Sequence, residues 1–160
     1  MKILITYFSH TGNTEKVVNI LANELKTKNS VDFQRLIPKN GATNFLTRCR
    51  DARRHERPEI KTINTDISKY DLIILATPVW AFNVAPAINT YLDQIHDLQK
   101  KNIVLILVSG GKMFINQCFA KIETELLEKN AGKVFKININ DKQLRNEAAI
   151  VTAFNTTVLV

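Results

Sequence analysis

Short, strongly apolar segments alternate along the chain with longer segments in which apolar residues recur every three or four positions. Runs of β-branched and aromatic residues that end at polar or glycine-containing stretches are typical of strands. One run, DLIILATPV, is nearly all apolar, as expected of a strand covered on both faces. The pattern predicts strands at Lys2–Phe8, Val31–Ile37, Asp71–Val79, Asn102–Val108 and Lys133–Ile139.

The segments between these strands carry apolar residues at helical spacing. Val17, Leu21 and Leu25, for example, fall on one face of a helix. The segment Thr43–Arg57 is polar, basic and only weakly periodic, and it closes at Pro58 because a helix seldom continues into the residue before a proline. The other predicted helices are Asn13–Lys28, Pro86–Gln99, a stripe from Ile115 to Leu126, and Asp141 to about Phe154 with Asp141 as the N-cap.

Strands and helices therefore alternate in the order βαβαβαβαβα. Such alternation favours a parallel sheet with helices on both faces and right-handed crossovers. With 160 residues, we expect a single domain, 1–160, with room for a buried core. Ligands of open sheets bind beyond the carboxyl ends of the strands, near the point where the strand order reverses. The stretches of interest are therefore residues 9–14, 77–86 and 109–114.

The composition, 45% hydrophobic and 23% charged, is that of an ordinary globular protein. The apolar runs are too short to span a bilayer, and the N-terminus lacks the shape of a signal peptide, so we expect no membrane partner. Cys49 and Cys118 are far apart in sequence, and we interpret them as reduced, structural thiols of a cytoplasmic protein. The net charge of +7 indicates anionic partners or ligands, but no basic–aromatic motif supports nucleic-acid binding.

Residues 9–14 read SHTGNT and separate the first strand from the first helix. Ser9, Thr11, Asn13 and Thr14 offer hydrogen-bonding side chains, and Gly12 allows close approach of the backbone. The helix that follows presents free N–H groups and a positive dipole end to an anion. Because the stretch lacks both the Walker lysine and a GxGxxG fingerprint, it predicts a site for one terminal phosphate held by neutral donors. A plain N-cap turn would use the same residues.

The other two stretches suit a flat ligand. Trp80 and Phe82 lie between two prolines at the end of the third strand, where an aromatic face can stack on a ring. The alternative is that Trp80 fills a gap in the core. Gly110 and Gly111 follow the fourth strand and permit close approach of the backbone to a ligand, or simply form a turn.

Taken together, these residues resemble the flavodoxin-like FMN-binding proteins over nearly the whole chain. SHTGNT is similar to the family's FMN phosphate loop, YDLIILATPVWAFNVAP to the stretch that holds the isoalloxazine ring, and VSGG to the third ligand loop. RDARRHERPEIKTI resembles a subset of the family in which an Arg/Glu-rich helix ends in RPE. The resemblance implies FMN as cofactor and a flavodoxin-like three-layer sandwich, an α/β fold with a five-stranded parallel sheet of order 2-1-3-4-5.

The resemblance also implies a set of cofactor-binding residues. One group would bind the phosphate, with His10 beside it; a second would line the flavin ring around Trp80; a third would close the pyrimidine side. In that order the groups are Ser9, Thr11, Gly12, Asn13 and Thr14; Pro78, Val79, Trp80, Ala81, Phe82 and Asn83; and Ser109, Gly110 and Gly111.

Two redox functions fit such a site. The first is a carrier that passes electrons between protein partners; the second is an enzyme that oxidises NAD(P)H and reduces a quinone or another small acceptor. In both, the flavin carries the chemistry, so no catalytic side chain is required, and His10, His55 and His96 lack the spacing of metal ligands. A non-catalytic doubly wound binding domain is a third alternative.

The positive charge sets this chain apart from the acidic flavodoxins. The basic segment Arg48–Arg57 fits a redox partner protein with an acidic face, or the phosphate of NADPH. Lys112 follows the two glycines of the third stretch, where a cation would favour the anionic reduced flavin and make its potential less negative.

Overall fold

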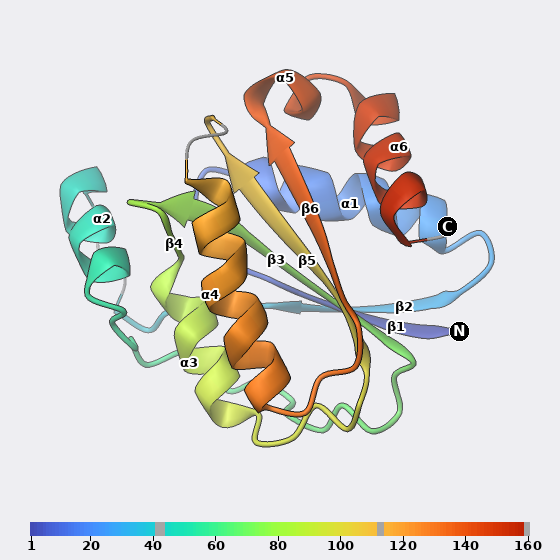
Figure 1. The fold of residues 1–160 in the computed structure, drawn as a ribbon, viewed down its shortest axis with the longest axis horizontal. Coiled ribbons are helices and arrows are strands. Elements are labelled where there is room, and N and C mark those ends of the chain that lie inside the picture. The colour runs from blue at the N-terminus through green and yellow to red at the C-terminus, as the bar shows by residue number, and fades with distance from the viewer. Residues whose placement is uncertain (41–43, 112–113, 159–160) are drawn as a thin grey trace.

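The central sheet lies between two layers of helices (Figure 1). The computed structural model describes residues 1–40, 44–111 and 114–158. Across the sheet the order is β2-β1-β3-β5-β6, with β4 paired to the end of β3. Without this short β4, the strands follow the predicted order 2-1-3-4-5, so the predicted fold class is confirmed. The main strands are β1 (Lys2–Tyr7), β2 (Ser30–Arg35), β3 (Leu72–Trp80), β5 (Asn102–Ser109) and β6 (Val134–Asn140).

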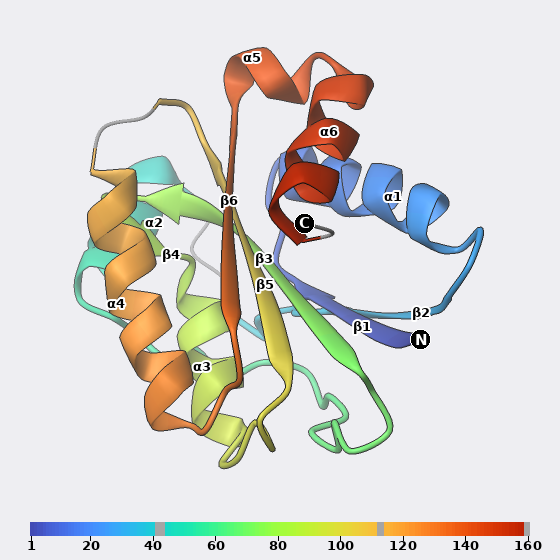
Figure 2. The ribbon, with the colours of Figure 1, turned by 45° about the vertical axis from the view of Figure 1, so that its right-hand side comes forward.

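Two helices cover each face of the sheet (Figures 1 and 2). On one face α1 (Asn13–Leu25) and α6 (Glu147–Val158) bury their apolar sides against the sheet. On the other face, α3 (Pro86–Gln94) and α4 (Ile115–Glu128) cover a second apolar cluster. The central strands β1, β3 and β5 are buried on both faces, which explains their nearly continuous hydrophobic sequence. Of the described helices, none is long and apolar enough to cross a membrane.

The remaining helix, α2 (Phe45–Arg53), lies beside the β3–β4 end of the sheet rather than on a face (Figure 1). Its N-cap is Asn44, whose side chain accepts a hydrogen bond from the Thr47 N–H (2.8 Å). Because a cap of this kind needs no apolar periodicity, the weak pattern of this segment still yields a helix.

The C-terminal helical segment differs from the prediction. It begins with a separate short helix, α5 (Asp141–Leu144), and its N-cap is Asn140 rather than Asp141. The Asn140 side chain accepts hydrogen bonds from the N–H groups of Lys142 (3.0 Å) and Gln143 (3.1 Å). The Gln143 side chain in turn accepts one from the Asn140 N–H (3.2 Å), which completes a capping box. The helix predicted to reach Gln99 likewise ends earlier, at the last residue of α3.

The register of the strands brings the three stretches of interest together. β1 runs parallel to β3 with Tyr7 opposite Ala76, and β3 runs parallel to β5 with Pro78 opposite Val108. The residues that follow each strand therefore emerge at one edge of the sheet. Since the strand order reverses between β1 and β3, this edge is where a doubly wound sheet binds its ligand.

Candidate functional site

The first stretch ends in a left-handed glycine at the start of α1. Gly12 is the N-cap residue and has φ of 90°, which L side chains rarely adopt. The side chain of Ser9 accepts a hydrogen bond from the Glu15 N–H (3.3 Å). Within the described chain, the N–H groups of Asn13 and Thr14 have no hydrogen-bond acceptor. These two donors and the helix dipole therefore face a position in front of α1 that suits an anion.

The side chains of this stretch divide between interior and solvent. Ser9 and Thr14 are buried, whereas His10, Thr11 and Asn13 are exposed. The buried hydroxyl of Ser9 is used to shape the loop. Contacts to a ligand in front of α1 would therefore come from the backbone and from the exposed Thr11 and Asn13.

An acidic side chain lies in the first turn of α1, where it could repel a phosphate. Glu15 is paired with Arg35 at 2.8 Å, and it accepts a hydrogen bond from the Tyr7 hydroxyl at 3.1 Å. Burial and the hydrogen bond to Glu15 raise the pKa of Tyr7. Because Arg35 offsets the carboxylate, the anion position in front of α1 keeps its attraction for negative charge.

The second stretch forms a tight hairpin that the sequence did not predict. β4 (Asn83–Val84) runs antiparallel to the end of β3, with Trp80 opposite Asn83. The two residues between them, Ala81 and Phe82, have φ of 46° and 65°. Positive φ at both positions is the conformation of a type I′ turn, which usually carries Asn-Gly. The turn is therefore strained, and it leaves the Phe82 ring exposed and in contact with Phe114 (centroids 4.7 Å apart).

We expect the double substitution Ala81→Asn with Phe82→Gly to raise the free energy of unfolding by about 1 kcal/mol, because both residues then tolerate positive φ. Urea denaturation of the FMN-free protein measures the effect. The single variant Ala81→Asn is the control, since it keeps the Phe82–Phe114 contact. A fall in stability of the double variant would show that this aromatic contact outweighs the strain of the turn.

The Trp80 ring is surrounded by three other side chains. It packs edge-on against Phe8 and His10, with centroids 5.5 and 6.2 Å away, and the Arg48 guanidinium lies over the ring at 5.5 Å. Arg48 also hydrogen-bonds to the His10 ring. Burial, together with the charge of Arg48, lowers the pKa of His10, so His10 is neutral at pH 7 and accepts from Arg48.

Internal hydrogen bonds fix the third stretch. Ser109 is buried, donates to the carbonyl of Gly111 (2.6 Å), and lies 2.9 Å from the side-chain oxygen of Asn138. A ligand would therefore meet mainly the backbone of Gly110 and Gly111 here. Lys112, which the sequence suggested as a cation near the flavin, lies outside the described residues.

A cavity of about 660 Å³ opens beside Trp80 on the side of α2. Its apolar floor includes Phe8 and Trp80, and its walls come from α2, the start of α3 and the segment between β2 and β3. Of the predicted cofactor residues, His10 and Trp80 line this cavity, whereas those of the third stretch do not. Among the residues that the structure describes, no group of three or more His, Cys, Asp or Glu side chains could hold a metal ion.

The family of the chain follows from its sequence as a whole. A sequence profile described as "Flavodoxin" matches residues 2–149. The chain belongs to the flavodoxin family. The resemblance noted from the sequence is therefore confirmed, while the search of curated proteins gave no match.

Several solved structures share this flavodoxin fold at low sequence identity. A proposed flavoprotein from Bacteroides eggerthii DSM 20697 is 24% identical, with a TM-score of 0.72 over 98% of this chain and 97% of that chain. A flavoprotein from Lactobacillus acidophilus NCFM, crystallised in complex with FMN, is 22% identical, with a TM-score of 0.73 over 92% and 98% of the two chains. A flavodoxin from the domain Archaea is 14% identical, with a TM-score of 0.61 over 98% of each chain.

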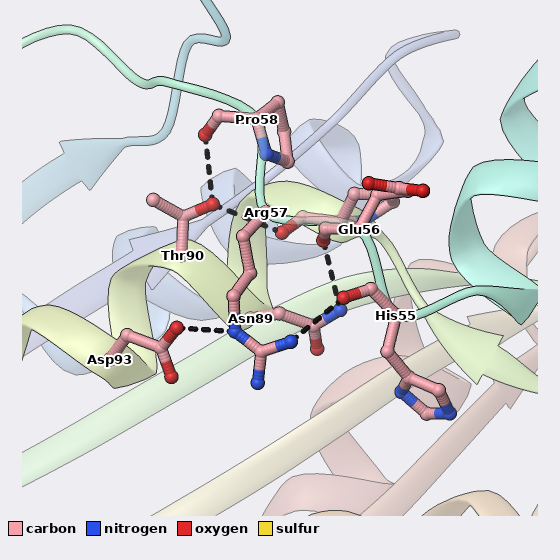
Figure 3. A network of polar contacts seen from close by, with 8 residues as sticks. His55, Glu56, Arg57, Pro58, Asn89, Thr90 and Asp93 are labelled. Atoms are coloured by element: carbon pink, nitrogen blue, oxygen red, sulfur yellow. Dashed lines mark hydrogen bonds and ion pairs between the residues drawn. The ribbon is translucent and has the colours of Figure 1, made fainter.

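Residues 55–59, which include the RPE sequence and are called the RPE segment, are fixed to α3 (Figure 3). Glu56, Arg57 and Pro58 of this segment line the cavity. Two buried polar side chains of α3 donate to backbone carbonyls of the segment, and an ion pair joins the two elements. Sequence reasoning missed these α3 residues, although polar residues in a mostly buried helix were a usable signal. The contacts are Asn89 Nδ2 to the Glu56 carbonyl (3.4 Å), Thr90 Oγ1 to the Pro58 carbonyl (2.8 Å), and Arg57 Nε to Asp93 Oδ2.

Proposed function

We propose that this protein binds FMN and transfers electrons through the bound flavin. FMN is the cofactor of the family to which the chain belongs, and one protein of the same fold was crystallised with it. The observation that carries the proposal is the start of α1, where the N–H groups of Asn13 and Thr14, which follow Gly12, have no acceptor among the described residues. This arrangement supports a terminal phosphate as ligand.

The residues of the three stretches then have distinct tasks. The phosphate lies against the backbone of the first stretch and the side chains of Thr11 and Asn13. The flavin ring contacts Trp80 and the backbone of the hairpin, and the backbone of Gly110 and Gly111 closes the pyrimidine side. When bound, the flavin supplies the redox chemistry, and the protein orients it and controls access of water and partners.

The spectrum and the cofactor of the purified protein test this proposal. The protein, isolated or reconstituted with flavin, should show the visible absorption of bound oxidised flavin. Chromatography of the cofactor released by denaturation should identify FMN and not FAD. A protein that stays colourless after incubation with excess FMN would contradict the proposal.

Trp80, the only tryptophan in the chain, reports on the ring site directly. We expect FMN to quench most of the tryptophan fluorescence, because the flavin ring would lie in contact with the indole. The variant Trp80→Leu should bind FMN about tenfold more weakly, since stacking on an aromatic ring contributes on the order of 1 kcal/mol or more. Phe33→Leu is the matched control, because Phe33 is an exposed aromatic residue of β2 outside the three stretches. If FMN leaves the tryptophan fluorescence unchanged, Trp80 does not contact the flavin and only packs in the core.

We favour an electron carrier between protein partners, one of which presents an acidic face to this basic protein. A second candidate is an NAD(P)H-dependent oxidoreductase, and the cavity beside Trp80 favours it because a carrier needs no small-molecule pocket. An NADPH oxidation assay with a quinone separates the two. Steady oxidation of NADPH with the quinone supports the enzyme. The carrier is supported if dithionite reduces the flavin but NADPH does not.

A further inference from the structure

Arginine is concentrated in one short part of the chain. Five of the seven arginines lie between residues 48 and 57, and none of the lysines falls in that range. The guanidinium group is planar, weakly hydrated and able to bind a carboxylate through two parallel hydrogen bonds, whereas the ammonium group of lysine is strongly hydrated. Arginine is also enriched in protein–protein interfaces, where lysine is depleted. A segment that takes its positive charge only from arginine therefore indicates recognition of anionic groups rather than mere solvation.

α2 turns most of these arginines toward solvent. Ala52 is fully buried on its inner side, and Arg48 reaches from that side over the Trp80 ring. The exposed residues of the helix and its C-cap are spaced by four, seven and eight positions, so they share the opposite side. We call this surface the α2 face, and it consists of Leu46, Arg50, Arg53 and Arg54.

Two of the three arginines on the α2 face are open to a partner. Arg50 is paired with the neighbouring Asp51 at 3.0 Å. Within the part of the chain that the structure describes, the side chains of Arg53 and Arg54 have no hydrogen bond, ion pair or ring contact. Cations in the last turn of a helix stabilise its dipole, but lysine would serve that purpose equally well. The dipole therefore explains the positive charge and not the choice of arginine.

The α2 face lies close to the proposed redox centre. α2 packs beside β3 and β4, which form the hairpin after Trp80 (Figure 1). A single helix therefore separates the α2 face from the ring that the flavin is proposed to contact. Electron transfer requires a partner to dock near the flavin, and the α2 face is placed where such a partner would bind.

An acidic protein and a nucleic acid are the two kinds of partner that would offer many negative charges to this face. Leu46 is 80% exposed at the start of the face, and a protein surface can bury it, whereas a phosphate backbone gains nothing from it. The carboxylate of Asp51 next to Arg50 would repel a closely spaced row of phosphates. These two residues favour the acidic protein.

We propose that the α2 face is the docking surface for an acidic electron-transfer protein, an inference that rests on the redox function proposed above. Arg53 and Arg54 bind carboxylates of the partner, and Leu46 packs against an apolar part of its surface. One electron leaves the reduced metal centre of the partner, which is oxidised, and enters the flavin, which is reduced.

Electron transfer from a reduced, acidic plant-type [2Fe–2S] ferredoxin to the FMN-loaded protein tests the proposal. Ferredoxins of this kind have strongly negative potentials, so reduction of the flavin is favourable. Stopped-flow absorbance measures the second-order rate constant. We expect the rate constant to fall about tenfold from low to high salt, because salt screens the attraction between opposite charges.

Two charge variants locate the docking surface. Arg53→Gln with Arg54→Gln should lower the rate constant at low salt about tenfold and leave it unchanged at high salt. The matched control is Lys28→Gln with Lys100→Gln. It removes the same charge from two exposed residues that precede β2 and β5, at the opposite edge of the sheet, and should change the rate constant little.

Leu46→Gln distinguishes docking from long-range attraction. It should weaken the affinity for oxidised ferredoxin about fivefold and leave the salt dependence of the rate unchanged, because loss of an apolar contact acts mainly on dissociation. Leu127→Gln is the matched control, since Leu127 is an exposed leucine in the last turn of α4, outside the α2 face. Calorimetry measures these affinities and needs no flavin.

Three results would overturn the proposal: a rate constant that does not depend on salt, an equal loss in both charge variants, or an unchanged affinity in Leu46→Gln. Tighter binding of a DNA duplex than of ferredoxin, lost in the double arginine variant, would also overturn it and assign the face to nucleic acid. Circular dichroism checks that each variant folds. Flavin absorbance measures FMN binding separately, so a failure of the cofactor assignment is distinguishable from a failure of this docking surface.

Discussion

Gly12→Ala should weaken FMN binding about thirtyfold and leave riboflavin binding unchanged. Gly12 has φ of 90°, and an L residue in the left-handed region costs about 1–2 kcal/mol. The loop will relax to relieve this strain, and the N–H groups of Asn13 and Thr14 will turn away from the phosphate. A hydrogen bond to a charged group contributes about 1.5–3 kcal/mol, so the loss of one weakens binding by roughly one to two orders of magnitude.

Riboflavin makes this experiment specific, because it has the same ring and ribityl chain but no phosphate. Calorimetry of the unaltered protein should show much tighter binding of FMN than of riboflavin. In Gly12→Ala the difference between the two affinities should be smaller. The riboflavin affinity of the variant is itself the control for folding, because a partly unfolded protein would bind both ligands more weakly. Equal binding of FMN and riboflavin by the unaltered protein would rule out the phosphate site.

The architecture was predictable because a strand that is buried on both faces has a continuous apolar sequence, which can be recognised without the structure. β3 and β5 lie between the two helical layers, and their sequences are almost continuously apolar. The ends of elements were less predictable, because caps depend on single hydrogen bonds. Asn140 and Asp141 are both good caps by residue type, and the Gln143 side chain decides in favour of Asn140.

The loops of the candidate site were also predictable, because they follow parallel strands of known order. The hairpin after Trp80 was not, since Ala81-Phe82 lacks the Asn-Gly signature of its turn type. The cavity could not be predicted from the sequence for another reason. Its walls depend on contacts such as Asn89 to Glu56, which join residues 33 positions apart and leave no periodic signal.

The folded protein should lose stability steeply as the pH rises from 9 to 12. Burial raises the pKa of Cys118 to about 11 from 9.0, and that of Tyr91 to about 12 from 10.0. Both groups are almost fully buried, in the layer of α3 and α4. A raised pKa means that the unfolded chain ionises first, so the stabilisation is complete below the unfolded pKa and is lost as the pH climbs to the folded one.

The size of the loss follows from the shifts. One pKa unit corresponds to about 1.4 kcal/mol, so each group accounts for roughly 2–3 kcal/mol over its interval, a large part of the stability of a typical domain. Urea denaturation under reducing conditions at pH 7, 9, 10, 11 and 12 would measure it. Thermal scans are less suitable, because ionisation and unfolding would overlap in one transition.

Two variants separate the contributions by pH. Cys118→Ala should flatten the decline mainly between pH 9 and 11, whereas Tyr91→Phe should flatten it between pH 10 and 12, because the intervals follow the two pairs of pKa values. Tyr91→Phe also removes the acceptor of the hydrogen bond donated by Thr6 (3.2 Å), so it should lower stability at pH 7 as well. The test therefore compares how steeply the free energy of unfolding falls with pH in each variant, not its value at pH 7. If both variants decline in parallel with the unaltered protein, other buried groups such as Tyr70, whose pKa is also raised, carry the alkaline loss instead.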